Sequence, residues 1–290
     1  METLIDSHCG AQLFAIDVKD FPKDATVLRQ NVEFQNIDIR DENAVKSYVR
    51  AHKFDGIVHL AAVSRVVAAE NDKKNCIETN FQGTKYLAEA AAENPDCWII
   101  FGSSREVYGE QSVFPVKENA ELLPLNVYGF YKLEGERIVR SLVRKNCVLR
   151  FSNIYGNLYD IHGRVIPTFV STAIKGGEIR LESGEQIIDF TYIDDTVASI
   201  IQCMKMLQSG DIDAETVHIS PGVANKITDI IDILRDMGFK FAVRKNPPRS
   251  YDVQRFVGDT VHRQQIFGDR SFIGLREGIG KLIKLVRQKS

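Results

Sequence analysis

The segment WIIFGSSREVYGE (residues 98–110) contains the clearest strand pattern of the chain. From Trp98 to Phe101 the residues are apolar at consecutive positions, and polar residues do not alternate with them. This pattern is typical of a strand in a parallel sheet that helices cover on both faces. We therefore predict a strand at residues 98–103 that is followed by a polar turn.

The same pattern recurs in the first half of the chain. We predict further strands at residues 13–18, 32–39, 56–62 and 147–151. Helical patterns lie between them at residues 42–52, 73–92 and 128–145, and Asp41 is a suitable N-cap for the first. Regular alternation of strand and helix predicts an α/β fold with a doubly wound parallel sheet.

The pattern changes after residue 157, where a polar, turn-rich stretch begins. We predict a helix at residues 165–175, a strand at 178–182, a helix that Asp194 or Asp195 caps and that ends at Leu207, and an amphipathic helix at 275–288. Residues 1–157 are predicted to form one domain. Residues 158–290 are predicted to form a smaller α+β lobe, with some segments returning to the core of the first domain.

Composition limits the classes of function. The chain has 290 residues and a net charge of −2, which does not favour a nucleic-acid partner. No apolar run reaches the roughly 18 residues of a membrane helix, and the first residues show no secretory pattern, so we expect a cytoplasmic protein without membrane contact. The five cysteines are odd in number and far apart, and the six histidines lack ligand spacing, so we predict buried free thiols and no metal site.

The segment YGFYK (residues 128–132) places Tyr128 and Lys132 four residues apart on a predicted helix, so their side chains share one face. A phenol has a pKa of about 10, and a nearby ammonium favours the phenolate. Ser104, which follows the predicted strand, can donate a hydrogen bond to the substrate oxygen or to the phenolate. The three residues are predicted to move the proton of a hydroxyl group while its carbon loses hydride, although Tyr-x-x-x-Lys also occurs as a plain surface pair.

In these motifs the chain resembles the extended short-chain dehydrogenase/reductases, specifically the NAD-dependent nucleotide-sugar epimerases and dehydratases. The segments that carry the resemblance stand in the family's order: IDV (16–18), DIRD (38–41), VHLAA (58–62), ETNFQGT (78–84), SSREVYG (103–109), YGFYK (128–132), RFSNIYG (150–156), DFTYIDD (189–195) and VGDT (257–260). The resemblance implies that residues 1–157 form a Rossmann-like domain that binds NAD.

The resemblance also implies roles for single residues. The cofactor-binding positions would be Asp17 at the adenosine ribose, Asp38, Ile39, Leu60, Ala61, Ala62, Asn80, Tyr128 and Lys132. The catalytic residues would be Ser104, Tyr128, Lys132 and Glu106, and the substrate would be bound by Ser104, Arg105, Asn153, Arg249 and Arg255. From the residues alone, Asp17 could also cap a loop and Asn153 could serve a turn, and we expect His59 to be a core histidine.

The activity that the resemblance implies is oxidation of a nucleotide-diphosphate sugar to a 4-keto intermediate, with 4-epimerisation as the leading expectation. The alternatives are 4,6-dehydration, decarboxylation, or a non-catalytic sugar-nucleotide-binding protein with a decayed cofactor site. Family members usually form homodimers through the helices that match residues 73–92 and 128–145, so we expect a homodimer.

Three positions depart from the family pattern. Family 4,6-dehydratases have Asp-Glu after the serine, where this chain has Arg105-Glu106, and many relatives have Arg where this chain has Ile188. Gly10 is the only glycine in the first 55 residues, so no glycine-rich phosphate loop precedes Asp17. We expect the chain to be an N-terminally shortened form of an enzyme whose first strand and loop would precede Met1.

Overall fold

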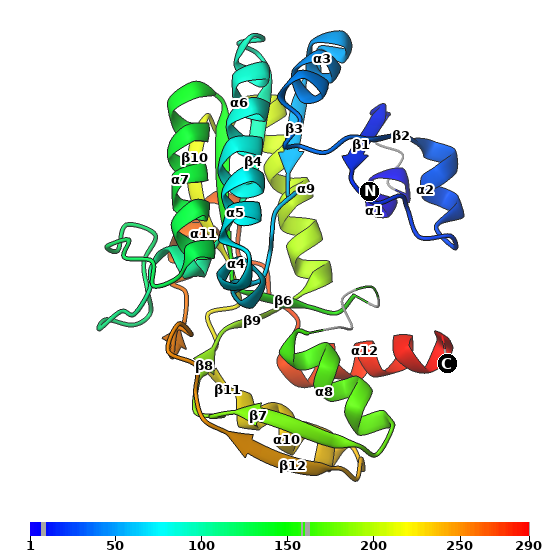
Figure 1. The fold of residues 1–290 in the computed structure, drawn as a ribbon, viewed down its shortest axis with the longest axis vertical. Coiled ribbons are helices and arrows are strands. Elements are labelled where there is room, and N and C mark those ends of the chain that lie inside the picture. Colours follow the sequence, from blue (N-terminus) through cyan, green and yellow to red (C-terminus); the bar gives the residue numbers. More distant parts are fainter. Residues whose placement is uncertain (7–9, 158, 160–162, 290) are drawn as a thin grey trace. The chain divides into compact units, whose positions relative to one another are not determined.

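The computed structural model describes residues 1–6, 10–157, 159 and 163–289 (Figure 1). The chain forms two compact units and crosses between them several times. The first unit contains Met1–Gly102, Tyr131–Val148 and Ile200–Glu215, and the second contains Ser103–Phe130, Leu149–Ser199 and Thr216–Ser290. The units therefore interleave along the sequence. The sequence predicted a boundary after residue 157, with some later segments returning to the core of the first domain.

The strands of the first unit belong to two sheets. β1 (Leu13–Asp17) and β2 (Val32–Asn36) pair in parallel, and β3 (Gly56–His59) pairs in parallel with β4 (Trp98–Ser104). With β5 (Asn146–Phe151) and β10 (Ala214–Ile219), the second sheet has the order β10-β5-β4-β3. All seven residues of β4 are buried, as its run of apolar residues predicts. The predicted α/β fold with a parallel sheet of the Rossmann type is confirmed.

The helices of the first unit include those predicted at residues 42–52 and 73–92. They are α1 (Glu2–Asp6), α2 (Thr26–Asn31), α3 (Glu42–His52), α4 (Val66–Asn71), α5 (Lys73–Cys76), the π-helical η1 (Ile77–Gly83) and α6 (Thr84–Ala92). Asp41 caps α3, because its side chain accepts a hydrogen bond from the Ala44 amide at 3.0 Å. The segment predicted as a single helix at residues 73–92 is helical throughout but contains the π-helical turn.

Two further helices contribute residues to both units: α7 (Val127–Leu142) and α9 (Ile193–Ser209). In the first unit α6 and α7 lie along β4 (Figure 1), and Ala88, Val139 and Phe101 meet in one apolar cluster. Gly135 allows the close approach of α7, because a Cβ atom there would lie 2.6 Å from the Phe101 ring. This packing positions the middle of α7 on the strand that ends at Ser104.

The second unit is α+β, as predicted for the later part of the chain. Its strands are β6 (Asn153–Tyr155), β7 (Glu178–Glu182), β8 (Ile187–Ile188), β9 (Phe190–Tyr192), β11 (Asn225–Lys226), β12 (Ala242–Asn246) and β13 (Arg255–Phe256). Its helices are η2 (Arg105–Val107), α8 (Val165–Ile174), α10 (Ile227–Asp236), α11 (Val261–Phe267) and α12 (Leu275–Lys289). Ile166, Ile230 and Ile279 belong to its apolar core.

The motif DFTYIDD organises the second unit through its first and last carboxylates. Buried Asp189 accepts hydrogen bonds from the amides of Gly222 at 2.9 Å and Gly258 at 3.2 Å, which ties VGDT to this motif. The predicted helix cap at Asp194 or Asp195 is wrong, since α9 begins at Ile193 and includes both residues in its first turn. Asp195 instead accepts a hydrogen bond from the Ile273 amide at 2.8 Å.

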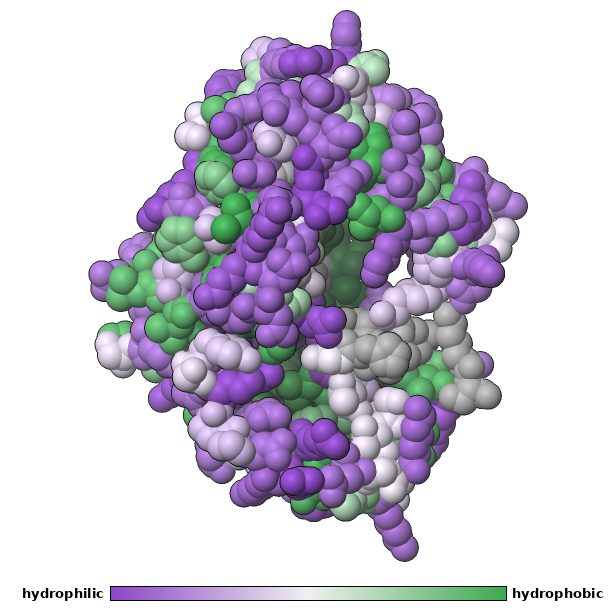
Figure 2. Space-filling model, viewed as in Figure 1, coloured by the Kyte–Doolittle hydropathy of each residue, from purple (hydrophilic) through white to green (hydrophobic). Residues whose placement is uncertain are grey.

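Cys76, Cys97, Cys147 and Cys203 are buried and free, as predicted, and Cys9 lies outside the described residues. In the face drawn in Figure 2 the surface of both units is largely hydrophilic. Within the described part of the chain, no helix is both long and apolar enough to cross a membrane.

Candidate active site

The predicted adenosine-binding residues lie after the first two strands of the first unit. Asp17 is the last residue of β1, is exposed, and accepts a hydrogen bond from the Lys19 amide at 2.9 Å. Asp38 forms an ion pair with Arg40 at 2.5 Å, and this guanidinium lowers the pKa of Asp38 below its ordinary value. Ile39 is buried, and its side chain packs against Gly83.

Asn80 fixes the backbone that follows β3. Its Oδ1 accepts a hydrogen bond from the Val63 amide at 2.7 Å, and its Nδ2 donates to the Val63 carbonyl at 3.1 Å. Val63 directly follows the predicted cofactor positions Leu60, Ala61 and Ala62. Asn80 thus acts on the position of these residues, and the Leu60 side chain remains 49% exposed.

His59 is a core residue, as the sequence predicts. Its Nε2 lies 2.9 Å from Thr84 Oγ1, and only 4% of the residue is exposed. Burial, with a smaller effect of the Lys132 charge, lowers the pKa of His59 to about 3. The imidazole is therefore neutral at ordinary pH and takes part in packing.

Lys132 places an ammonium group inside the first unit. It is 4% exposed, its Nζ donates to the Gly102 carbonyl at 2.7 Å, and it lies 4.9 Å from the centre of the Phe101 ring. Burial lowers the pKa of Lys132 to about 8, against the smaller raising effects of Cys76 and Glu136. No ion pair joins Lys132 to a carboxylate among the described residues, so its other N–H groups suit the hydroxyl groups of a ligand.

In the second unit, Ser104 ends β4 and adjoins the start of α7. Its Oγ accepts a hydrogen bond from the Glu106 amide at 3.2 Å, which leaves the hydroxyl proton for donation. Close packing explains why the residue after Tyr128 in YGFYK is a glycine. A Cβ atom at Gly129 would lie 2.4 Å from the Glu106 carbonyl oxygen. The first turn of α7, which carries Tyr128, thus lies against the turn that follows Ser104.

Arg105 and Glu106 form a buried ion pair, with 2.9 Å between Arg105 Nη2 and Glu106 Oε1. Arg105 Nε donates to Asn153 Oδ1 at 2.9 Å, although the two residues are 48 positions apart in sequence. Asn126 Nδ2 donates to Glu106 Oε2 at 2.8 Å. The structure therefore brings together three of the predicted residues, Arg105, Glu106 and Asn153.

The other two predicted arginines contact neighbouring side chains. Arg249 Nε donates to Asp252 at 2.8 Å, and the Arg255 guanidinium lies 4.0 Å from the centre of the Phe114 ring. Ile188, the position where many relatives have arginine, is buried in the apolar core of the second unit. Among the described residues, no hydrogen bond joins Arg249 or Arg255 to Asn153.

Sequence reasoning missed Asn126 and a buried network around Tyr108. Asn126 both binds Glu106 and caps α7, since its Oδ1 accepts from the Gly129 amide at 2.8 Å. The Tyr108 hydroxyl lies 2.5 Å from His218 Nε2 and accepts from Arg150 Nη1 at 2.6 Å. An asparagine just before the helical pattern was a usable cap signal, whereas no local pattern links Tyr108 to His218.

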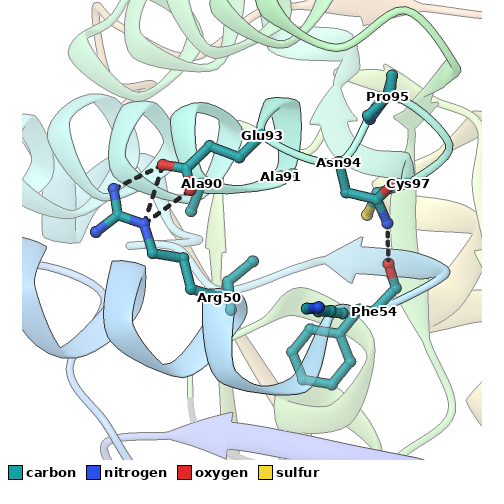
Figure 3. Close-up of a pocket in the computed structure, with 10 residues that line it drawn as sticks. Arg50, Phe54, Ala90, Ala91, Glu93, Asn94, Pro95 and Cys97 are labelled. Carbon is teal, nitrogen blue, oxygen red and sulfur yellow. Dashed lines mark hydrogen bonds and ion pairs between the residues drawn. The ribbon is translucent and has the colours of Figure 1, made fainter.

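A pocket of about 350 Å³ lies in the first unit between α3 and α6 (Figure 3). Arg50 and Glu93 form an ion pair at its wall, and Asn94 Nδ2 donates to the Phe54 carbonyl at 3.3 Å. None of the predicted catalytic, cofactor-binding or substrate-binding residues is part of its lining. This pocket is therefore not the candidate active site.

Residues 8–218 match the model of the NAD dependent epimerase/dehydratase family. The chain is 27% identical over 275 residues to a putative UDP-glucose 4-epimerase from Methanocaldococcus jannaschii, which covers 91% of this chain and 87% of the relative. It is 26% identical to a UDP-glucose 4-epimerase from Lacticaseibacillus casei, with 91% and 88% covered.

Solved structures resemble the chain over nearly its whole length. The UDP-glucose 4-epimerase of Thermotoga maritima, solved with UDP-glucose, has a TM-score of 0.90 at 26% identity and covers 99% of this chain and 94% of that chain. MoeE5, solved with UDP-glucuronic acid and NAD, has a TM-score of 0.89 at 22% identity, with 100% and 94% covered. The likeness to MoeE5 concerns the fold alone.

Proposed function

Because the chain belongs to the NAD dependent epimerase/dehydratase family, we propose that it is a 4-epimerase acting on a nucleotide-diphosphate sugar through a 4-keto intermediate. The observation that carries this proposal is the alignment with UDP-glucose 4-epimerases over about 91% of the chain. The substrate class, a nucleotide sugar, is the one named for those relatives. The residues YGFYK and Ser104 supply the proton chemistry that such a reaction requires.

The family is NAD dependent, and the residues of the first unit fit this cofactor. The buried ammonium of Lys132 has N–H groups beyond its bond to Gly102, which hydroxyl groups of a ribose would satisfy. The exposed carboxylate of Asp17, at the carboxyl end of a parallel strand, suits the hydroxyl groups of the other ribose. We propose that Asp38, Ile39, residues 60–62 and Asn80 complete the cofactor contacts, with Ile39 acting through its backbone and Asn80 by positioning.

In the proposed reaction, NAD held by these residues would supply the hydride transfer at C4 of the sugar, first from the carbon and then back to its other face. Tyr128 removes the C4 hydroxyl proton as the hydride leaves and gives it back in the second half of the cycle. Lys132, four residues later on the continuous helix α7, favours the phenolate form of Tyr128. Ser104 donates a hydrogen bond to the same substrate oxygen and holds it in place.

We propose that Arg105 and Asn153 contact the sugar and that Arg249 and Arg255 bind the diphosphate. Ile188 lacks a charge and is 5% exposed, so it cannot bind phosphate as an arginine would. Arg255 is exposed, and its stacking on Phe114 leaves guanidinium N–H groups for an anion. These two arginines are therefore the proposed source of positive charge for the nucleotide.

We also propose that the protein is a cytoplasmic homodimer that associates through α6 and α7. In support, α7 has apolar surface available for such a contact, since Phe130 is 46% exposed and Leu142 is 40% exposed.

The proposed function is tested by incubating the purified protein with NAD and each of UDP-, dTDP- and GDP-glucose, and by following the C4 configuration with NMR. We expect at least one of these sugars to equilibrate with its C4 epimer. A protein that converts none of the three into an epimer would refute the proposal. Formation of a 4-keto-6-deoxy sugar as the main product would assign the chain to the dehydratases instead.

A further inference from the structure

The 4-keto sugar of the proposed reaction is prone to a side reaction at C5. The C4 carbonyl acidifies the C5–H bond, and a nearby base that takes this proton leaves the electron pair in an enolate. The enolate can then expel the C6 hydroxyl group, which leaves as water when an acid protonates it, or be reprotonated at C5 from solvent. An epimerase of this kind must therefore keep general bases away from C5.

Glu106 is the carboxylate that lies nearest in sequence to Ser104, and its amide donates to Ser104 Oγ at 3.2 Å. Its backbone also lies against Gly129, the residue after Tyr128. Glu106 thus lies in the turn that follows Ser104 and packs against the first turn of α7, which carries Tyr128. A free carboxylate at this place would be a candidate base for an intermediate held by Ser104 and Tyr128.

Both oxygens of this carboxylate are occupied. Oε1 lies 2.9 Å from Arg105 Nη2, and Oε2 accepts from Asn126 Nδ2 at 2.8 Å. The side chains of Arg105 and Glu106 are 8% and 9% exposed, so water competes little for this pair. Asn126 is itself fixed, because its Oδ1 caps α7 through the Gly129 amide.

Arg105 has polar groups besides the one that binds Glu106. Its Nε donates to Asn153, a proposed substrate contact, at 2.9 Å. Its Nη1 is buried and has no hydrogen-bond partner among the described residues. Buried donors without a partner are uncommon in proteins, so this one needs an explanation. An acceptor on the bound sugar would satisfy Arg105 Nη1.

We propose that Arg105 is a positioning residue that holds Glu106 away from proton abstraction at C5, so that the 4-keto intermediate is reduced again and not dehydrated. This inference rests on the proposed function, since it requires the 4-keto intermediate. It assigns to Arg105 and Asn126 a role in the outcome of the reaction. Arg105 Nη1 would at the same time donate to the sugar.

The test is an epimerisation in D2O with UDP-glucose, or with whichever nucleotide sugar the protein converts, followed by NMR of the product at C5. We expect wild-type product to retain protium at C5. In Arg105→Met, Glu106 Oε1 loses its partner, and we expect deuterium at C5 to rise at least tenfold per turnover. Arg105→Lys retains a cation beside Glu106, and we expect its C5 deuterium per turnover to lie below that of Arg105→Met.

The double variant Arg105→Met/Glu106→Gln is the matched control, because it removes the carboxylate that would exchange the proton. We expect its C5 deuterium to return to the wild-type level. Rapid C5 exchange by active wild-type protein would overturn the inference, and so would an active Arg105→Met variant without increased exchange. If the variant does not fold, the wild-type result decides alone, whereas a wild-type protein that epimerises no sugar contradicts the proposed function itself.

Discussion

Lys132 carries a positive charge in a place that disfavours charge. Its ordinary pKa of 10.5 falls to about 8, and burial is the largest cause. The Gly102 carbonyl and the Phe101 ring, with smaller effects of Cys76 and Glu136, compensate only in part for the lost hydration. The residue therefore costs stability in the protein without ligands, and its chemistry is the reason we propose for its presence.

Replacing Lys132 with Met tests this cost. Each pKa unit corresponds to about 1.4 kcal/mol, so we expect the free energy of unfolding at pH 7 to rise by up to about 3 kcal/mol. We expect the epimerase rate to fall at least about 100-fold, because the phenolate of Tyr128 loses its cation. Urea denaturation and the rate assay on the same preparation measure both effects.

The pH dependence of the free energy of unfolding tests the direction of the Lys132 pKa shift. The folded pKa of Lys132 lies below the unfolded one, so between pH 8 and 10.5 the unfolded state binds more protons. Wild-type stability therefore gains from Lys132 as the pH rises through this interval, and the advantage of Lys132→Met should narrow. A variant that is less stable than wild type at pH 7 would contradict the account of Lys132.

At the scale of elements, the start of α7 is joined tightly to the turn after β4. Asn126 caps the helix and binds Glu106, while Gly129 lets the helix approach the Glu106 carbonyl. These contacts fix where Tyr128 stands relative to Ser104 within the second unit. The proposed catalytic geometry thus depends on a backbone contact as well as on the side chains of Ser104 and Tyr128.

Gly129→Ala tests this contact. The new Cβ atom would lie 2.4 Å from a carbonyl oxygen, so α7 must move. We expect a loss of about 1–3 kcal/mol of stability and a fall of at least tenfold in kcat. Gly280→Ala, in the interior of α12, is the matched control, since its Cβ would meet nothing closer than 3.9 Å. Unfolding curves and kcat for both variants measure the difference, and equal effects would refute the role of Gly129.

At the scale of the whole molecule, the sequence was most informative where local patterns decide structure. The apolar run at Trp98 predicted β4, and Asp41 predicted the start of α3, because both signals are confined to neighbouring residues. The points at which the chain crosses between the two units were not predictable in this way, since they depend on which distant segments pack together. The bond between Arg105 and Asn153 likewise joins residues 48 positions apart.

The central claim is that the chain inverts C4 through hydride loss and return with Tyr128 as the base. The most direct test is the conversion of UDP-glucose in D2O by wild type and Tyr128→Phe, read by NMR at C4 of the product. We expect wild type to form UDP-galactose that keeps protium at C4, and the variant to lose activity by about 1,000-fold or more. Deuterium at C4 of the wild-type product, or wild-type rates in Tyr128→Phe, would contradict the account.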